Sequence, residues 1–199
     1  MNGQTTIDLL RHGEPVGGRR YRGQIDDPLS DKGWQEMWRA VSGETPWQQI
    51  ISSPLSRCLA FAEALSQKLE IPLQQDDRLK EVGFGNWEGK SGAELRALDP
   101  QILARFYRDP LGNRPAGAEP LEAFSQRVAA ALGEAIETHA GKHLLIVTHA
   151  GVIRAALANT ISAPIETMYR LSIASASLSR IQLDGERPAS VMFLGRETI

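Results

Sequence analysis

The segment HLLIVTH, residues 143–149, constrains the fold of this chain more than any other part of the sequence. Between its two histidines the residues are almost all apolar. A nearly continuous apolar run of this length is typical of a strand that is buried on both faces, as in parallel sheets covered by helices. We therefore expect a strand here that is buried on both faces.

Strand-like and helix-like segments alternate along the rest of the chain. Strands are expected at residues 5–12, 47–53 and 71–79, of which the last has the weakest pattern. Helices are expected at 30–43, 54–69, 119–140 and 151–161, with one or two short helices at 89–110 split near Asp99 and Pro100, and a closing hairpin at 175–195. This alternation predicts an α/β fold with a largely parallel central sheet. Since no repeat or linker is evident, residues 1–199 are expected to form one domain.

Two helix starts can be placed from their capping residues. Ser30 is the expected N-cap of the helix at 30–43. Ser53 is expected to cap the helix at 54–69, with Pro54 in the first helical position, where a missing N–H costs little.

The composition excludes several classes of protein. A net charge of -2 gives no sign of nucleic-acid or membrane-surface binding. The single cysteine, Cys58, excludes an intrachain disulfide framework. No apolar run approaches the roughly 18 residues of a membrane span, and the N-terminal segment is too polar for a signal peptide. We expect a cytoplasmic protein, with the oligomeric state left open and a homodimer among the possible states.

Three predicted strands end in polar residues of an unusual kind. The first ends in Arg11 and His12, the second leads through Ser53 to Arg57 in the next helix, and the long apolar run ends in His149. Ligands of open α/β sheets bind beyond the carboxyl ends of the strands. If these strands are neighbours, two arginines and two histidines converge at one edge of the sheet.

A phosphoryl group suits such a set of side chains. Arginine presents paired planar donors that match phosphoryl oxygens, and helix N-termini after Ser53 and His149 would add backbone N–H groups. One histidine can attack phosphorus, and the other can stabilise the transferring oxygens. Glu81, which precedes a glycine-rich turn, can serve as general acid and then as base for water.

Each of these residues also has a simpler explanation. His12 could be a satisfied turn histidine, His149 a capping residue, Arg57 a solvated helix residue and Glu81 an exposed loop carboxylate. The presence of all four in one chain favours a common phosphoryl-transfer site over these separate explanations. The loop GGRRYRG, residues 17–23, is either a flexible basic loop or a substrate-recognition loop. In the second reading Arg19, Arg20 and Arg22 face the substrate, with Arg22 and Gly23 the candidate binding residues.

The motifs LLRHGE, SSPLSRC, LKEVGFGNWEG and LLIVTHAGVIR, in this order, resemble those of the histidine phosphatase superfamily, also called the phosphoglycerate mutase-like family. The resemblance implies a three-layer α/β/α sandwich around a mixed, mainly parallel six-stranded sheet. It further implies that His12 is phosphorylated and that Arg11, Arg57 and His149 bind the phosphoryl group, with Glu81 as the acidic residue. No metal or cofactor is expected; the partner is a small phosphomonoester.

The details of the sequence favour a phosphatase within this family. Mutases usually continue RHGE with a polar residue and then Trp-Asn, whereas this chain has Pro15 and then Gly17-Gly18. The segments RGQIDDPLSDKGWQEM and EPLEAFSQRV are similar to those of bacterial α-ribazole phosphatases of cobalamin biosynthesis. The alternatives are a broad phosphatase of sugar phosphates or nucleotides, a phosphoglycerate mutase, and an inactive phosphate-binding module. The sequence contains neither of the glycine-rich nucleotide-binding motifs.

Overall fold

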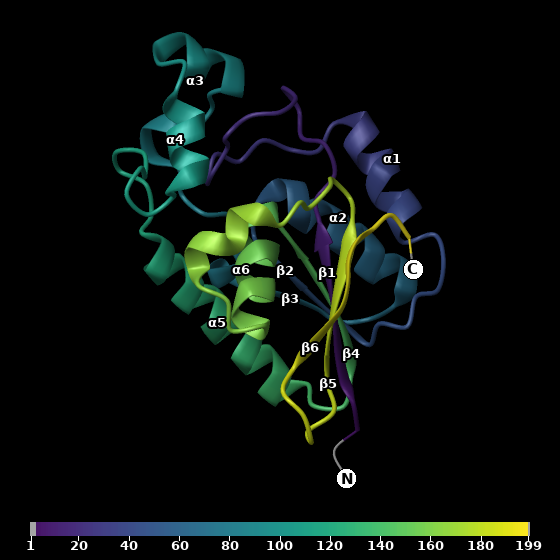
Figure 1. The fold of residues 1–199 in the computed structure, drawn as a ribbon. Coiled ribbons are helices and arrows are strands. Elements are labelled where there is room, and N and C mark those ends of the chain that lie inside the picture. Colours follow the sequence, from purple (N-terminus) through teal and green to yellow (C-terminus); the bar gives the residue numbers. More distant parts are fainter. Residues whose placement is uncertain (1–2, 199) are drawn as a thin grey trace.

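The apolar run that begins at His143 forms strand β4, which lies inside a six-stranded sheet (Figure 1). The computed structural model describes residues 3–198. The strand order is β3-β2-β4-β1-β5-β6, and the first four strands are mutually parallel whereas β5 and β6 form an antiparallel hairpin. The strands are β1 (Thr5–Arg11), β2 (Gln49–Ser52), β3 (Leu73–Gln75), β4 (His143–Thr148), β5 (Leu178–Leu183) and β6 (Ser190–Arg196). The expected mixed, mainly parallel sheet is therefore confirmed.

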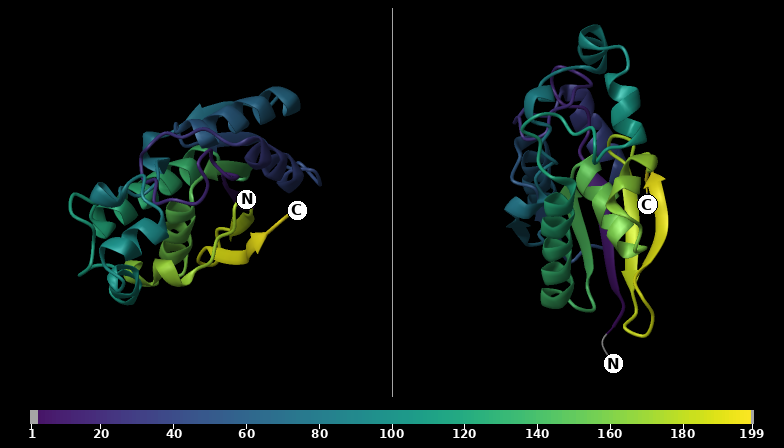
Figure 2. Two further views of the ribbon diagram at one scale, coloured as in Figure 1. Left: turned by 90° about the horizontal axis from the view of Figure 1, so that it is seen from above. Right: turned by 60° about the vertical axis from the view of Figure 1, so that its left-hand side comes forward.

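Helices cover both faces of this sheet, as the left view of Figure 2 shows. One layer contains α1 (Asp31–Ala40) and α2 (Ser56–Leu69), and the other contains α5 (Leu121–Thr138) and α6 (Ala150–Thr160). Between η2 (Gly85–Trp87) and α5 the chain forms α3 (Gly92–Leu98) and α4 (Ile102–Arg108), separated near Asp99 and Pro100 as expected. The remaining short helices are η1 (Asp77–Leu79) and η3 (Ile165–Arg170). In residues 3–198 no helix is long and apolar enough to cross a membrane.

The alternation of side chains along the strands builds two separate cores. On one face Leu10 of β1 and Leu145 of β4 pack with Phe61 of α2. On the other face Leu9 and Ile146 pack in the cluster that contains Phe124 of α5. Since successive strand residues point to opposite faces, a strand buried on both sides is mostly apolar. The three-layer sandwich predicted from the sequence follows from this pattern.

The starts of α1 and α2 differ in how well the sequence predicted them. Ser30 caps α1 as expected, because its hydroxyl accepts the N–H of Gly33 at 3.0 Å. The prediction for α2 was wrong: the helix begins at Ser56, and neither Ser53 nor Pro54 belongs to it. The carboxylate of Asp26 accepts both the backbone N–H and the hydroxyl of Ser56, at 2.7 and 2.8 Å. A distant loop therefore caps this helix in place of the local serine.

The third predicted strand is shorter than the sequence pattern suggested. Only Leu73–Gln75 pair with β2, and the chain then turns into η1. Asp76 ends the strand, because its carboxylate accepts the backbone N–H of Arg78 at 2.8 Å and also binds the Arg78 guanidinium. This local carboxylate–backbone bond competes with further sheet pairing.

One buried carboxylate stabilises the middle of the sheet. Asp8 of β1 is fully buried and accepts hydrogen bonds from Trp47 Nε1 at 2.8 Å, His143 Nε2 at 2.8 Å and Arg180 Nε at 2.7 Å. Burial alone would raise the pKa of Asp8, but the hydrogen bonds from His143, Arg180 and Trp47 outweigh it and hold that pKa below its ordinary value.

Replacing Asp8 with Asn should lower the free energy of unfolding at pH 7 by about 2 to 3 kcal/mol, because buried donors lose a charged acceptor. The depressed folded-state pKa makes the contribution of Asp8 complete above about pH 4 and lost as pH falls through the folded-state pKa. The Asp8→Asn variant should lack this acid-dependent component. Urea unfolding at several pH values measures both effects. Equal stability of the two proteins at pH 7 would contradict the prediction.

Candidate active site

The register of the parallel strands places three polar residues side by side at one edge of the sheet. His12 follows β1 and its backbone N–H bonds to the Thr148 carbonyl at 2.9 Å, directly before His149. Ser53 follows β2 and bonds to the Val147 carbonyl at 3.0 Å. The rings of His12 and His149 have centroids 5.2 Å apart and lie edge to face. Two of the predicted site residues are therefore in direct contact.

The ring of His12 is held in one tautomer. Its Nδ1 lies 2.7 Å from the carbonyl oxygen of Gly13, which can only accept a hydrogen bond. The proton therefore sits on Nδ1, and Nε2 keeps its lone pair. Gly13 permits this turn because a Cβ there would lie 2.3 Å from the carbonyl oxygen of Gly33. The RHG motif thus requires glycine on steric grounds.

The environment keeps His12 neutral. Its side chain is buried, and burial is the main cause that lowers the pKa of His12 well below its ordinary value. The nearby guanidinium groups of Arg11 and Arg57 lower it further, against a smaller opposing effect of the Gly13 carbonyl. A neutral imidazole with a free lone pair is the nucleophilic form.

His149 is fully buried, and its ring is oriented by Ser53, which the sequence predicted only as a helix cap. Its Nε2 lies 2.7 Å from the hydroxyl of Ser53. The Sγ of Cys58 lies 3.6 Å from the same nitrogen, and burial raises the pKa of that thiol. Burial also lowers the pKa of His149, with Arg57 as the next cause. The Ser53 hydroxyl therefore contacts the ring of His149 and also accepts the N–H of Leu55 at 3.3 Å, although Ser53 is not the N-cap of α2.

The two arginines are anchored by backbone carbonyls. Arg11 donates from Nη1 to the Ile173 carbonyl at 2.7 Å, and Arg57 donates to the carbonyls of Ile25 at 2.7 Å and Gly23 at 2.9 Å. The Nε of each arginine is buried and, within residues 3–198, has no hydrogen-bond partner. Burial lowers the pKa of Arg11 to about 10, so the group stays charged at neutral pH. Buried cationic donors without a partner favour an anionic ligand.

The Glu81 carboxylate lies at the N-terminus of α6, the helix that begins directly after His149. This carboxylate accepts the N–H of Val82 at 2.9 Å and the N–H of Gly151 at 3.2 Å. A Cβ on Gly151 would lie 2.1 Å from Glu81 Oε1, so glycine is required for the close approach.

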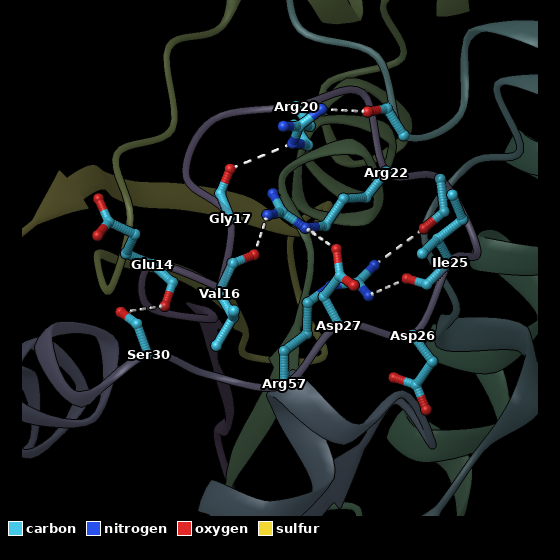
Figure 3. A network of polar contacts seen from close by, with 12 residues as sticks. Glu14, Val16, Gly17, Arg20, Arg22, Ile25, Asp26, Asp27, Ser30 and Arg57 are labelled. Carbon is cyan, nitrogen blue, oxygen red and sulfur yellow. Dashed lines mark hydrogen bonds and ion pairs between the residues drawn. The ribbon is translucent and has the colours of Figure 1, made fainter.

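The basic loop that follows His12 is held by its own backbone and side chains (Figure 3). Arg22 is buried, donates from Nε to Asp27 at 2.8 Å and donates from Nη2 to the Val16 carbonyl at 2.6 Å. Arg20 bonds to the Gly17 and Gly89 carbonyls, and Arg19 is exposed.

Gly23 takes part in the same loop as a turn residue. Its φ of 52° lies in the left-handed region, and a Cβ there would lie 2.0 Å from Glu88 Oε1. Its carbonyl anchors Arg57. Arg22 and Gly23 therefore shape the loop and support Arg57, and their predicted contact with substrate stays a prediction.

The arrangement contains the groups that phosphoryl transfer requires. A neutral imidazole can attack, two guanidinium groups can neutralise charge, a second, neutral histidine can hydrogen-bond to an oxygen, and a carboxyl group can exchange protons. Within the described part of the chain, no group of three or more His, Cys, Asp or Glu residues is arranged to hold a metal ion.

Lowering the pH from 7 to 5.5 should leave the rings of His12 and His149 neutral, since the pKa of each is depressed. Replacing Arg57 with Met should raise both pKa values, because Arg57 is one cause of both shifts. Histidine ring ¹⁵N and ¹³C shifts in NMR titrations report the protonation state. If the ring of His12 or His149 titrates near pH 6.5 in the wild type, the prediction that this ring stays neutral is wrong.

The family comparison covers nearly the whole chain. Residues 7–194 match the model of the Histidine phosphatase superfamily (branch 1). The chain is 32% identical to "Probable phosphoglycerate mutase GpmB" of Salmonella paratyphi C, over 88% of this chain and 83% of that protein. It is also 30% identical to the "Bifunctional protein Rv2228c" of Mycobacterium tuberculosis, over 96% of this chain and 54% of that protein. The chain thus spans about half the length of that relative.

Solved structures share the same arrangement of elements. Bacillus stearothermophilus YhfR superposes with a TM-score of 0.87 at 31% identity, covering 96% of this chain and 97% of that one. The α-ribazole phosphatase from Shigella flexneri superposes with a TM-score of 0.81 at 26% identity, covering 98% of both chains. The motifs, the fold and the family match agree, and the chain belongs to the histidine phosphatase superfamily.

Proposed function

We propose that this protein is a phosphomonoesterase that works through a phosphohistidine on His12 and needs no metal ion. The observation that carries the proposal is the pair of buried, unpartnered Nε donors of Arg11 and Arg57 within the described residues, beside the neutral ring of His12. These donors match the oxygens of a phosphoryl group, and the free Nε2 of His12 supplies a nucleophile. A module that only bound phosphate would need the arginines but not that nucleophile.

The first step transfers the phosphoryl group to the enzyme. The lone pair of His12 Nε2 attacks phosphorus, and the bond from phosphorus to the ester oxygen breaks. The bond electrons stay on the leaving oxygen, which takes a proton from the Glu81 carboxyl group. Arg11 and Arg57 neutralise charge on the other three oxygens, and the neutral ring of His149 offers a hydrogen bond to them.

The second step releases phosphate. Glu81, now a carboxylate, takes a proton from water while the water oxygen attacks phosphorus. The phosphorus–nitrogen bond breaks, and its electrons return to His12 Nε2. The products are inorganic phosphate, neutral His12 and protonated Glu81, which is the starting state.

We propose α-ribazole 5′-phosphate, in cobalamin biosynthesis, as the substrate. The resemblance of RGQIDDPLSDKGWQEM and EPLEAFSQRV to α-ribazole phosphatases supports this choice, as does the structural match to the Shigella flexneri protein. The residues after His12 argue against a mutase, because Pro15 and Gly17 stand where mutases usually carry a polar residue and Trp-Asn. The identity to GpmB keeps a phosphoglycerate mutase as the second candidate, and a broad phosphatase of sugar phosphates or nucleotides is the third.

Phosphate release from α-ribazole 5′-phosphate in excess EDTA should be fast and should vanish in the His12→Ala variant. p-Nitrophenyl phosphate and 3-phosphoglycerate serve as comparison substrates in the same assay. Similar slow release from all three would replace the ribazole ester with a broader substrate range. Isomerisation of 3-phosphoglycerate that depends on bisphosphoglycerate would identify a mutase, and activity retained without His12 would refute the phosphohistidine.

Replacing Arg57 with Ala should lower kcat/KM about 10² to 10³-fold, because a charged donor to the transition state is lost. Arg57→Lys keeps the charge but not the planar fork, so it should recover only part of the loss. Steady-state kinetics measure both variants, with thermal unfolding as the control for folding. Near-native kcat/KM in Arg57→Ala would show that this arginine does not bind the phosphoryl group.

A further inference from the structure

An ion pair that is not among the predicted site residues contacts the backbone of the segment that carries Glu81. Arg127 of α5 binds the carboxylate of Glu119 through two parallel bonds, Nε to Oε1 at 2.6 Å and Nη2 to Oε2 at 2.9 Å. Both side chains are only 20% exposed. The guanidinium also stacks over the ring of Phe124, 4.7 Å from its centroid. The pair is therefore fixed in its geometry and partly shielded from solvent.

The same pair binds the backbone on both sides of Glu81. Arg127 donates from Nη1 to the carbonyls of Arg78 at 2.5 Å and Lys80 at 2.8 Å, and from Nη2 to the carbonyl of Glu81 itself at 3.2 Å. Glu119 accepts the N–H of Gly83 at 3.0 Å through Oε2. Its own backbone N–H bonds to the Gly83 carbonyl at 3.1 Å.

The segment that carries Glu81 has no regular structure of its own. Residues 81–84 lie between η1 and η2 and belong to neither a helix nor a strand. Their path therefore depends on contacts with other elements. Arg127 of α5 and Glu119, which precedes this helix, supply such contacts, together with a bond from Arg114 to the Gly83 carbonyl at 3.0 Å. Arg11, His12 and Arg57 are instead placed by β1 and α2.

We propose that Arg127 and Glu119 are positioning residues for the acid of the reaction. By holding the backbone of residues 80–83, they keep the Glu81 carboxyl group beside the N-terminus of α6, where it can reach the leaving oxygen. The proposal rests on the proposed function, in which Glu81 protonates that oxygen. Since a misplacement of about 1 Å can cost 10²-fold in rate, their loss impairs proton transfer more than phosphate binding.

The test compares two esters with different leaving groups. Ribose 5-phosphate releases an alkoxide, which needs a proton, whereas 2,4-dinitrophenyl phosphate releases a phenolate that is stable without one. The parameter is kcat/KM, which covers the steps up to formation of the phosphoenzyme. Arg127→Met and Glu119→Gln should each lower kcat/KM for ribose 5-phosphate by about 10 to 100-fold. For the dinitrophenyl ester the loss should stay below about 3-fold.

Arg180→Met is the matched control. Arg180 binds Asp8 with the same two-bond geometry, at 2.7 and 3.0 Å, but at the middle of the sheet. This variant should lower the melting temperature without changing the ratio of kcat/KM between the two esters. Arg127→Lys, which keeps the charge but not the two-bond geometry, should fall between the wild type and Arg127→Met.

The Glu81→Gln variant distinguishes the acid role of Glu81 from the positioning role of Arg127 and Glu119. If this variant shows no selective loss on ribose 5-phosphate, the acid role of Glu81 in the proposed function is wrong, and the positioning role falls with it. If Glu81→Gln shows the selective loss but Arg127→Met, Arg127→Lys and Glu119→Gln lower both esters equally or not at all, the positioning role alone is overturned. A selective loss in Glu81→Gln and in the Arg127 and Glu119 variants supports both.

Discussion

The parallel pairing of β4 with β1 on one side and β2 on the other decides where the reactive side chains lie. The three strands end within one residue of the same level, since Arg11 is level with Thr148 and Ser52 with Val147. The next residue on each chain segment therefore reaches the same edge of the sheet. A slip of one residue would send His12 or His149 to the other face and would bury the wrong side chains at the same time. The apolar register that builds the two cores thus also sets the site.

Electrostatics explains why this edge tolerates so many ionisable groups. The two histidines are buried without charge, and the arginines meet backbone carbonyls and, at longer range, the carboxylate of Glu81. A charged imidazole in this place would face desolvation and like charge together. The fold therefore keeps both histidines neutral and the two arginines hydrogen-bonded to backbone carbonyls, an arrangement that suits an anionic ligand.

The sequence predicted the architecture because the architecture depends on local patterns. The apolar run at residues 143–149, the cap at Ser30 and the break near Pro100 all act within a few residues of themselves. Other contacts join segments that are far apart in the chain. They are the bond between Ser53 and His149, the cap that Asp26 provides for α2, and the carbonyl anchors of Arg57. No local pattern reports such contacts. The segment EPLEAFSQRV contains Glu119 and Arg127, but without the fold nothing in it indicates that both reach the backbone at Glu81. The cytoplasmic location and single domain stay predictions.

The loop between His12 and α1 has a further consequence for the start of α2 and for Arg57. Its Asp26 caps α2, and its Gly23 and Ile25 carbonyls anchor Arg57. Outward movement of this loop would remove the cap of α2 and the backbone anchors of the Arg57 guanidinium together. Moving this loop would therefore break several hydrogen bonds at once. While this loop stays in place, the start of α2 and the side chain of Arg57 are both held by it.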